Sequence, residues 1–336
     1  MRALALVLLL SACAPVFQSP GPPVTAPHFE EYAFVTDDGA RLPLKRWLPD
    51  GQPRAAVLAL HGFNDYSNAF DDTAKYLARQ GVATYAYDQR GFGANPNPGL
   101  WPGDAVLVRD FESGIAALRS KYPKTPVLVL GESMGGAVAL TALGNSAGTA
   151  GVDGAMLIAP AVWGRETMDV FKRSALWLSA RLTPDWTFTG RGLDITPSDN
   201  KEMLRALSRD PLVIKKTRAD AIWGVVNLMD DALDAAPQVK TPLLILYGEK
   251  DEIIPKEPTR LLLERLPRNG ATTVAVYEKG YHMLTRDLEA EIVWRDIAAW
   301  IEARAANAKA PLPSGADARN WGALGPPPAR TRGERP

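Results

Sequence analysis

The sequence predicts an α/β fold, with a mostly parallel eight-stranded sheet flanked by helices and a helical cap inserted after the sixth strand. The chain has 336 residues, 46% of them hydrophobic, which is enough for one large core. Its middle part alternates apolar runs of strand length with runs of helical periodicity. One long segment, 161–240, interrupts the alternation. Strands that alternate with helices favour a parallel sheet covered on both faces.

The eight expected strands are short runs rich in apolar and β-branched residues, at 32–36, 42–48, 55–60, 82–87, 127–130, 152–158, 243–247 and 273–277. The first two form a hairpin around the turn Asp37-Asp38-Gly39. Helices are expected at 69–79, 105–122, 135–143, 258–265 and 288–305, the last of which ends the domain.

The segment 161–240 contains several helical stretches and no clear strand. It carries Trp163, Trp177, Trp186 and Trp223. So long an excursion between two strands predicts an inserted helical cap within a domain that spans 31–305. We expect most of these aromatic side chains to pack the cap on the core.

Both ends of the chain have other compositions. Residues 1–13 contain Arg2, a short apolar run and then small residues, which is typical of a secretory signal. The apolar run is far shorter than the roughly 20 residues that span a bilayer. Residues 14–30 are rich in proline and predict a tether. Residues 306–336 are rich in Ala, Pro, Gly and Arg and predict a disordered tail.

The end of the signal segment, Leu10-Ser11-Ala12-Cys13, resembles the lipobox of bacterial lipoproteins. That resemblance implies lipid attachment at Cys13, the one cysteine of the chain. A membrane surface then becomes a partner. Ala14 after the cysteine favours the outer membrane over the inner. The alternative is ordinary signal cleavage nearby, which leaves a soluble secreted or periplasmic protein.

Charge and motifs exclude several classes of function. The 38 basic residues balance the 38 acidic ones, whereas a nucleic-acid partner would require a basic surface. The sequence has neither a Cys/His cluster of metal-ligand spacing nor a Gly-rich phosphate loop. We therefore expect no metal and no cofactor. The oligomeric state stays open.

The run Gly131-Glu132-Ser133-Met134-Gly135 carries the clearest chemical signal. It lies between an expected strand and an expected helix, where a sharp turn would lift the Ser133 hydroxyl above the sheet. The helix N-terminus would then lie beneath developing negative charge. Such a turn is crowded, and Gly131 and Gly135 leave the space it needs. Ser133 is the predicted nucleophile.

A serine nucleophile needs a base and an orienting acid, which in folds with this turn follow it along the chain. His282 is the one histidine downstream of Ser133, and it follows the last expected strand. It would take the serine proton and return it to the leaving group. The acid lies in the loop after strand 243–247, where Glu249, Asp251 and Glu252 are candidates.

The oxyanion of the intermediate needs two backbone N–H donors. The first is expected from Met134, directly after the nucleophile. The second is expected from Phe63, in the loop after strand 55–60. Gly62 lets this backbone approach the substrate closely. His61 is expected to support the loop by donating to a backbone carbonyl.

These motifs together resemble the monoacylglycerol lipase and lysophospholipase branch of the α/β-hydrolases, which is serine aminopeptidase S33-like. The resemblance covers about 30–305 and rests on His61-Gly62, Asp88-Gln89-Arg90-Gly91-Phe92-Gly93, the run around Ser133, the Asp251 loop and His282. It implies Asp251 as the acid, because the family shows G-x-x-D followed shortly by Pro. Two departures are Glu132, where many members have His, and Ala94-Asn95, where many have Ser.

The resemblance implies a carboxylic ester hydrolase that works through an acyl-enzyme on monoacylglycerol- or lysophospholipid-type substrates. Alternatives are a small-ester carboxylesterase and a serine peptidase that removes an N-terminal residue. The peptidase would need a cap carboxylate to hold the substrate amine, for which Glu202, Asp230, Asp231 and Asp234 are available. A further alternative is a non-catalytic binding protein of the cell envelope.

Overall fold

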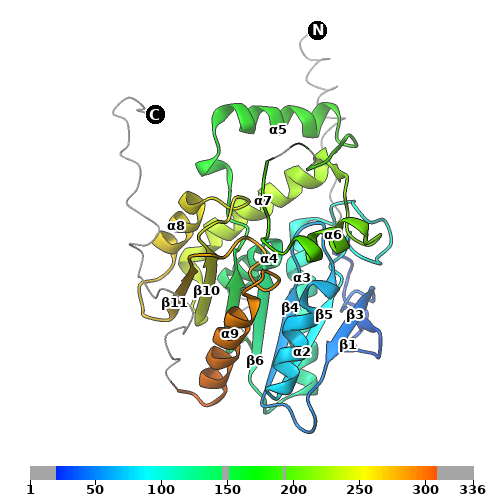
Figure 1. The fold of residues 1–336 in the computed structure, drawn as a ribbon. Helices are drawn as coiled ribbons and strands as arrows, with labels where there is room; N and C mark the ends of the chain where they lie inside the picture. The colour runs from blue at the N-terminus through cyan, green and yellow to red at the C-terminus, as the bar shows by residue number, and fades with distance from the viewer. Residues whose placement is uncertain (1–19, 146–150, 191, 193, 309–336) are drawn as a thin grey trace.

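The computed structural model describes residues 20–145, 151–190, 192 and 194–308. One large sheet forms its centre, with helices on both faces and a helical cap over one end (Figure 1). The strands are β1 (His28–Phe29), β2 (Ala33–Val35), β3 (Arg41–Trp47), β4 (Ala55–Leu60), β5 (Val82–Tyr87), β6 (Val127–Glu132), β7 (Gly154–Ile158), β10 (Leu243–Gly248) and β11 (Thr272–Tyr277).

The strands lie in the order β1-β2-β3-β5-β4-β6-β7-β10-β11. The six strands from β5 to β11 in this order are parallel, whereas β1, β2 and β3 are antiparallel to their neighbours. The predicted mostly parallel sheet with flanking helices is therefore confirmed. Parallel strands end at one edge, so the loops after β4, β6, β10 and β11 gather there.

The sheet has nine strands rather than the eight we predicted. The additional strand β1 lies inside the segment expected to be a tether, and it pairs with β2. Its Phe29 ring packs on Phe34 and Tyr85, with ring centroids 5.2 and 4.7 Å apart. A strand of two residues is too short to show alternation in the sequence, and the aromatic packing holds it in place. The sheet thus begins at His28.

The helices are α2 (Asp71–Arg79), α3 (Asp104–Lys121), α4 (Met134–Gly144), α5 (Val170–Leu182), α6 (Lys201–Arg209), α7 (Ala219–Ala235), α8 (Lys256–Arg265) and α9 (Ala290–Ala305), with 3-10 turns at Ser67–Phe70, Arg165–Thr167 and Ala236–Gln238. The central strands are buried on both faces, and β4 shows how. Leu58 and Leu60 face the core that holds α3, α4 and α8, whereas Val57 faces the core that holds α2 and α9.

The cap rises between β7 and β10, as predicted, and contains α5, α6 and α7. It also holds a small antiparallel ribbon, β8 (Thr187–Phe188) with β9 (Thr217–Arg218), where the sequence had shown no clear strand. Each strand is two residues long and carries no alternation. Helix α7 packs on α4 through Leu228, Ala232 and Leu233, which are buried. Within the described residues, no helix is both long and apolar enough to cross a bilayer.

We expect Gly135→Ala to lower the free energy of unfolding by about 3 kcal/mol or more, in the upper range for overpacking a core. A Cβ on Gly135 would overlap the Leu60 carbonyl oxygen of β4. Urea denaturation measures the loss. Gly190→Ala is the matched control, because a Cβ there meets no heavy atom within 4 Å. Equal stability of the two variants would contradict this account of the crowded turn.

Candidate active site

Ser133 lies at the turn between β6 and α4. Its backbone has φ 50° and ψ −112°, a conformation that costs free energy for any residue with a side chain. Two hydrogen bonds join the turn to the end of β7 and the residues after it. Ser133 N–H donates to the Ile158 carbonyl (2.9 Å), and Ala161 N–H donates to the Ser133 carbonyl (2.9 Å). The predicted strand-to-helix turn at the serine is thus present.

The glycines around Ser133 are there for space. A Cβ on Gly131 would lie 2.8 Å from the Gly136 Cα, and one on Gly136 would lie 2.9 Å from the Pro160 Cβ. Real Cβ atoms do not approach so closely. A Cβ on Gly62 would lie 3.4 Å from the Ser133 Cβ. The loop after β4 therefore runs directly beside the serine.

His282 and Asp251 meet at the same edge of the sheet. The His282 ring Nδ1 and the Asp251 Oδ2 are 2.8 Å apart, and both side chains are buried. The other carboxylate oxygen of Asp251 accepts from the N–H groups of Ile253 (2.8 Å) and Ile254 (2.9 Å). Asp251 is thereby fixed in the orientation that holds the histidine. It is the one of the three candidate acids that contacts His282.

The described contacts do not include a hydrogen bond between the Ser133 hydroxyl and the His282 ring. Ser133 directly follows β6, and His282 lies in the loop after β11, so both residues are at the carboxyl edge of the sheet. Such hydrogen bonds are often long or misaligned until substrate is bound. With Nδ1 donating to Asp251, the other ring nitrogen of His282 is left as a proton acceptor.

The two predicted oxyanion donors, Met134 and Phe63, lie directly after Ser133 and in the loop after β4. Met134 is the first residue of α4, so its N–H has no partner within the helix. The Phe63 ring packs on Phe92 and Trp101, with centroids 5.6 and 6.0 Å apart. Among the described residues neither N–H has a hydrogen-bond acceptor. Both groups are therefore available to an oxyanion.

His61 supports this loop, as expected. Its Nε2 accepts from Gln89 N–H (2.9 Å), so the proton is on Nδ1, which donates to the Gly62 carbonyl (2.8 Å). The Gln89 side chain donates in turn to the His61 carbonyl (2.8 Å). Burial lowers the pKa of His61. The imidazole stays neutral and holds the loop that carries Phe63.

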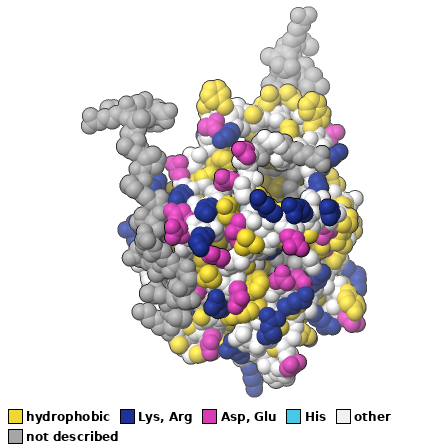
Figure 2. All heavy atoms as spheres, in the orientation of Figure 1, with side chains coloured by type: hydrophobic (Ala, Val, Ile, Leu, Met, Phe, Trp, Pro, Cys, Tyr) yellow, Lys and Arg dark blue, Asp and Glu magenta, His cyan; other side chains and the backbone are white. Residues whose placement is uncertain are grey.

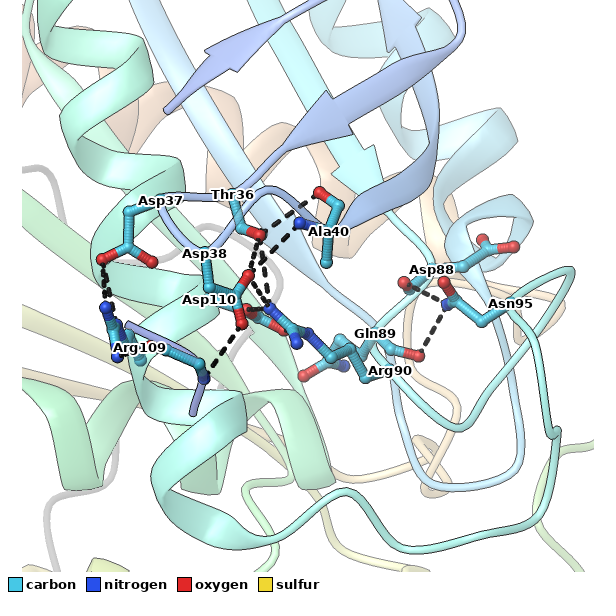
Figure 3. A network of polar contacts seen from close by, with 11 residues as sticks. Thr36, Asp37, Asp38, Ala40, Asp88, Gln89, Arg90, Asn95, Arg109 and Asp110 are labelled. Atoms are coloured by element: carbon cyan, nitrogen blue, oxygen red, sulfur yellow. Dashed lines mark hydrogen bonds and ion pairs between the residues drawn. The ribbon is translucent and has the colours of Figure 1, made fainter. Parts of the chain in front are cut away.

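The loop after β5 explains one departure from the family pattern. Asn95 donates through its amide to the carbonyl oxygens of Asp88 (2.6 Å), Gln89 (3.0 Å) and Phe92 (3.0 Å). The Asp88 carboxylate accepts from the N–H groups of Ser67 and Ala94. In Figure 3, dashed lines join the Asn95 amide to Asp88 and to Gln89. Asn95 thus closes the loop that positions the partner of His61.

Arg286, which was not predicted from the sequence, joins three loops of the site. Its guanidinium donates to Asp65 (2.7 Å), after the oxyanion loop, and to Glu132 (2.7 Å), directly before the nucleophile. Arg286 itself follows His282 by four residues. Burial lowers the pKa of the arginine, but the Glu132 and Asp65 carboxylates outweigh this and raise it. The one sign of this ion pair in the sequence is Glu132, which stands where many family members have His.

The loop that carries His282 is also bonded to the cap. The Ser198 hydroxyl donates to Asp287 (2.5 Å), and Met283 N–H donates to the Pro197 carbonyl (3.1 Å). The Asn200 amide donates to the Arg286 carbonyl (3.0 Å). Burial raises the pKa of Asp287 to about 6, against the opposing bond from Ser198. Residues 197–200 and the histidine loop therefore form one connected unit.

The four carboxylates considered for binding a substrate amine are occupied or point elsewhere. Asp230 is paired with Arg165, and Asp234 with Arg265. Asp231 and Asp234 line a separate surface pocket of about 860 Å³ beside Pro237 and Lys240. Glu202 is exposed in the first turn of α6. None of the four contacts Ser133, Asp251 or His282 in the described part of the chain.

Two further predictions concern the lipid attachment and metal binding. Cys13 lies outside the described residues, so the structure leaves its lipidation a prediction. The described part of the chain holds no group of three or more His, Cys, Asp or Glu side chains that could hold a metal ion.

The strained serine, the Asp251–His282 pair and the crowded strand-to-helix turn define a hydrolase of the α/β-hydrolase fold. Residues 51–289 match the model of the family described as serine aminopeptidase, S33. This match covers more than half of the chain, and the protein belongs to that family.

Characterised relatives extend over nearly the whole chain. Human monoglyceride lipase is 27% identical over 292 residues, which are 85% of this chain and 95% of the relative. Monoacylglycerol lipase of Mycolicibacterium smegmatis is 28% identical over 274 residues, which are 81% and 96% of the two chains. These relatives support the expected class of carboxylic ester hydrolase.

Solved structures agree with the fold. The monoacylglycerol lipase of Paleococcus ferrophilus superposes with a TM-score of 0.66, at 22% identity over 78% of this chain and 99% of its own. A soluble variant of Saccharomyces cerevisiae monoglyceride lipase, in complex with a substrate analogue, gives a TM-score of 0.70 at 19% identity over 85% and 99%. At these identities the likeness concerns the fold alone.

We expect Arg286→Met to lower the free energy of unfolding by about 3–5 kcal/mol, because two buried carboxylates lose their counter-charge. Urea denaturation measures the change. Adding Glu132→Gln to this variant should recover part of the loss, since one of the two unpaired charges is then removed. Arg295→Met, at an exposed position of α9, is the control. A loss no larger than that of the control would show that the ion pairs carry no stability.

Proposed function

We propose that the protein hydrolyses carboxylic esters through an acyl-enzyme, with Ser133 as nucleophile, His282 as base and Asp251 as the acid that orients it. The observation that carries this proposal is the 2.8 Å contact between His282 and Asp251 at the sheet edge where the strained Ser133 turn ends. The same edge offers the free N–H groups of Phe63 and Met134.

The chemistry follows from these groups. His282 accepts the Ser133 proton as the hydroxyl oxygen attacks the ester carbonyl, and the oxyanion accepts hydrogen bonds from Phe63 and Met134. The protonated ring, stabilised by Asp251, then donates its proton to the leaving alcohol. Water activated by the same ring attacks the acyl-enzyme, and release of the acid restores the Ser133 hydroxyl. Protons balance over the cycle, because the leaving alcohol receives the proton that Ser133 gave up and Ser133 recovers one from the attacking water.

The substrate class we propose is a monoacylglycerol or lysophospholipid. Its support is the length over which the chain matches relatives named monoglyceride or monoacylglycerol lipase. Figure 2 shows a hollow beneath the top of the molecule with hydrophobic side chains inside it, which suits an acyl chain. The small-ester carboxylesterase remains the first alternative.

A peptidase that removes N-terminal residues is the second candidate, because the family model carries an aminopeptidase description. Such an enzyme must bind the substrate amine. The ion pairs of Asp230 and Asp234 with arginine, and the exposed position of Glu202, favour the ester over the peptide.

We expect a fluorophosphonate probe to label wild-type protein at Ser133. Ser133→Ala should lose labelling and lower the rate of ester hydrolysis roughly a thousandfold or more, because the nucleophile is gone. Mass spectrometry locates the label, and Ser174→Ala, an exposed serine of α5, is the control. Labelling of the Ser133→Ala variant at another serine would exclude the proposed nucleophile.

A panel of p-nitrophenyl esters of rising chain length, together with monoacylglycerols, lysophospholipids and aminoacyl anilides, tests the substrate class. We expect medium-chain esters to have higher kcat/KM values than acetate, because more apolar surface leaves water in the transition state. The anilides should be hydrolysed more slowly than both. Fastest hydrolysis of acetate would favour the small-ester enzyme, and fastest hydrolysis of anilides the peptidase.

We also propose that Cys13 is lipidated and that the protein is held in the cell envelope, at the outer rather than the inner membrane. The support is the run Leu10-Ser11-Ala12-Cys13 after a short apolar segment. In a bacterial host, the wild-type chain should incorporate an alkyne-labelled fatty acid and sediment with membranes. Cys13→Ser should abolish the label. Retention of the label in this variant would rule out the thiol as the attachment site.

A further inference from the structure

The backbone on both sides of the proposed base is held by hydrogen bonds. Tyr281, directly before His282, donates its N–H to the Asp287 carboxylate (2.8 Å). Met283, directly after His282, donates its N–H to the Pro197 carbonyl of the cap (3.1 Å). Two acceptors outside the triad, a carboxylate and the cap, therefore set the path of the chain through the histidine.

The carboxylate of Asp287 also reaches the cap. Its Oδ2 accepts from Tyr281, whereas its Oδ1 accepts from the Ser198 hydroxyl at 2.5 Å. Both Asp287 and Ser198 are buried, with exposed fractions of 7% and 1%. The Asn200 N–H donates to the Ser198 oxygen (3.2 Å), which leaves the hydroxyl proton for the carboxylate. One buried carboxylate thus joins the cap to the residue before the base.

Asp287 borders two open spaces. One is a cavity of about 170 Å³, which Tyr277 and Leu284 also line. The other is a groove of about 450 Å³, which Met203 and Trp294 also line. Atoms without close neighbours lose van der Waals contacts. The hydrogen bonds of Asp287 therefore carry more of the restraint here than they would in a closely packed core.

No ion pair neutralises Asp287 within the described ranges of the chain. Arg286, the residue before it, is paired with two other carboxylates. Lys279, which lines the cavity of about 170 Å³, is paired with Glu289. The carboxylate therefore depends on its two hydrogen-bond donors.

Keeping this carboxylate ionised costs free energy. Burial raises the pKa of Asp287 to about 6, and the carboxylates of Asp199 and Glu132 act in the same direction, against the bonds from Ser198 and Tyr281. An aspartate in an unfolded chain titrates near pH 4. The contribution of this group to stability is therefore lost as the pH rises from about 4 to about 6, because the folded protein binds the proton more tightly. A charge that is buried at such a cost is typical of a functional site.

We propose that Asp287 is a positioning residue for His282, which it aligns through the Tyr281 N–H while the Ser198 hydroxyl joins it to the cap. The inference rests on the proposed function, in which His282 is the base. Asp287 and Ser198 do not touch the reacting atoms. Both act through the backbone that carries the imidazole, so residues 197–200 of the cap take part in aligning the base.

The effect of this alignment is expected in kcat rather than in KM. His282 takes the serine proton during acylation and activates water during deacylation, so a misaligned ring slows both steps. When both steps slow by the same factor, kcat falls and KM changes little. A residue that bound only the acyl chain would change KM instead.

The first test is Asp287→Asn, because the amide has nearly the same size but accepts through one oxygen only. At pH 8 its kcat on a soluble p-nitrophenyl ester should be roughly tenfold lower, with KM within about twofold, since small displacements of a catalytic group are costly. Ser198→Ala, which removes the donor of the cap and leaves the Tyr281 bond, should lower kcat by roughly threefold. Steady-state kinetics on the full chain measures both.

Glu289→Gln is the matched control, because it exchanges a carboxylate for an amide two residues further along the same loop. Its exposed side chain is bonded to Lys279. The control should keep the wild-type kcat. The double variant Asp287→Asn with Ser198→Ala should have a kcat close to that of Asp287→Asn alone, since the hydroxyl then has no carboxylate to hold.

The pH profile separates this positioning role from a general loss of stability. At pH 5 most of the wild-type Asp287 carboxyl is protonated, because its pKa is about 6. The tenfold difference in kcat between wild type and Asp287→Asn at pH 8 should therefore shrink to about twofold or less at pH 5. The ratio of the two kcat values removes the titration of groups that both proteins share. Urea denaturation at both pH values checks that each variant is folded in the assay.

Three results would overturn the positioning role: equal kcat values of wild type and Asp287→Asn at pH 8, a change confined to KM, or a kcat ratio that does not vary with pH. Ser133→Ala is assayed alongside. Ester hydrolysis that survives in Ser133→Ala would overturn the proposed function, which keeps the two failures distinct.

Discussion

The turn at Ser133 is the constraint on which the rest of the structure depends. A residue with a side chain is held at φ 50° because the chain must leave β6 and enter α4 within a single position. That geometry is possible only where β4, β6 and α4 approach so closely that Gly131 and Gly135 have no room for a Cβ. The strain is offset by the surrounding sheet, whose bonds from Ile158 and to Ala161 grip the serine on both sides. The sheet, buried on both faces, thus holds the backbone of Ser133 in this strained conformation.

Around this turn, buried polar groups hold the loops together in addition to the packing of Phe63 on Phe92 and Trp101. Arg286 joins Asp65 and Glu132, so the oxyanion loop, the nucleophile and the histidine loop meet at one guanidinium. A neutral His61 ties the oxyanion loop to the loop after β5 through Gln89. Each of these groups would be costly to leave unpaired in the interior. The three loops are therefore joined to one another by bonds that are costly to break.

The sequence was sufficient for features that leave a local pattern. The alternation of strands and helices predicted the parallel sheet, and the cap lies where the alternation is interrupted. The contact of His282 with Asp251 agrees with their predicted pairing, because each follows an apolar strand. Features built by distant single residues could not be predicted. Asp65, Glu132 and Arg286 are far apart in the chain, and no spacing relates them. The two-residue strands β1, β8 and β9 are too short for alternation, and only packing or pairing in the fold defines them. The exposure of Phe171 and Leu178 on α5 could not be predicted either, since periodicity does not tell which face of a helix has a partner.

Two parts of the cap have different contacts: residues 197–200 are bonded to the histidine loop, whereas helix α5 is not part of these bonds. Pro197, Ser198 and Asn200 are joined by hydrogen bonds to the segment that carries His282, so a displacement of one segment would break these bonds or move the other. Helix α5, by contrast, packs on α7. One insertion thus contributes segments with different surroundings: residues 197–200 are bonded to the loop of His282, whereas α5 is supported by another helix of the cap.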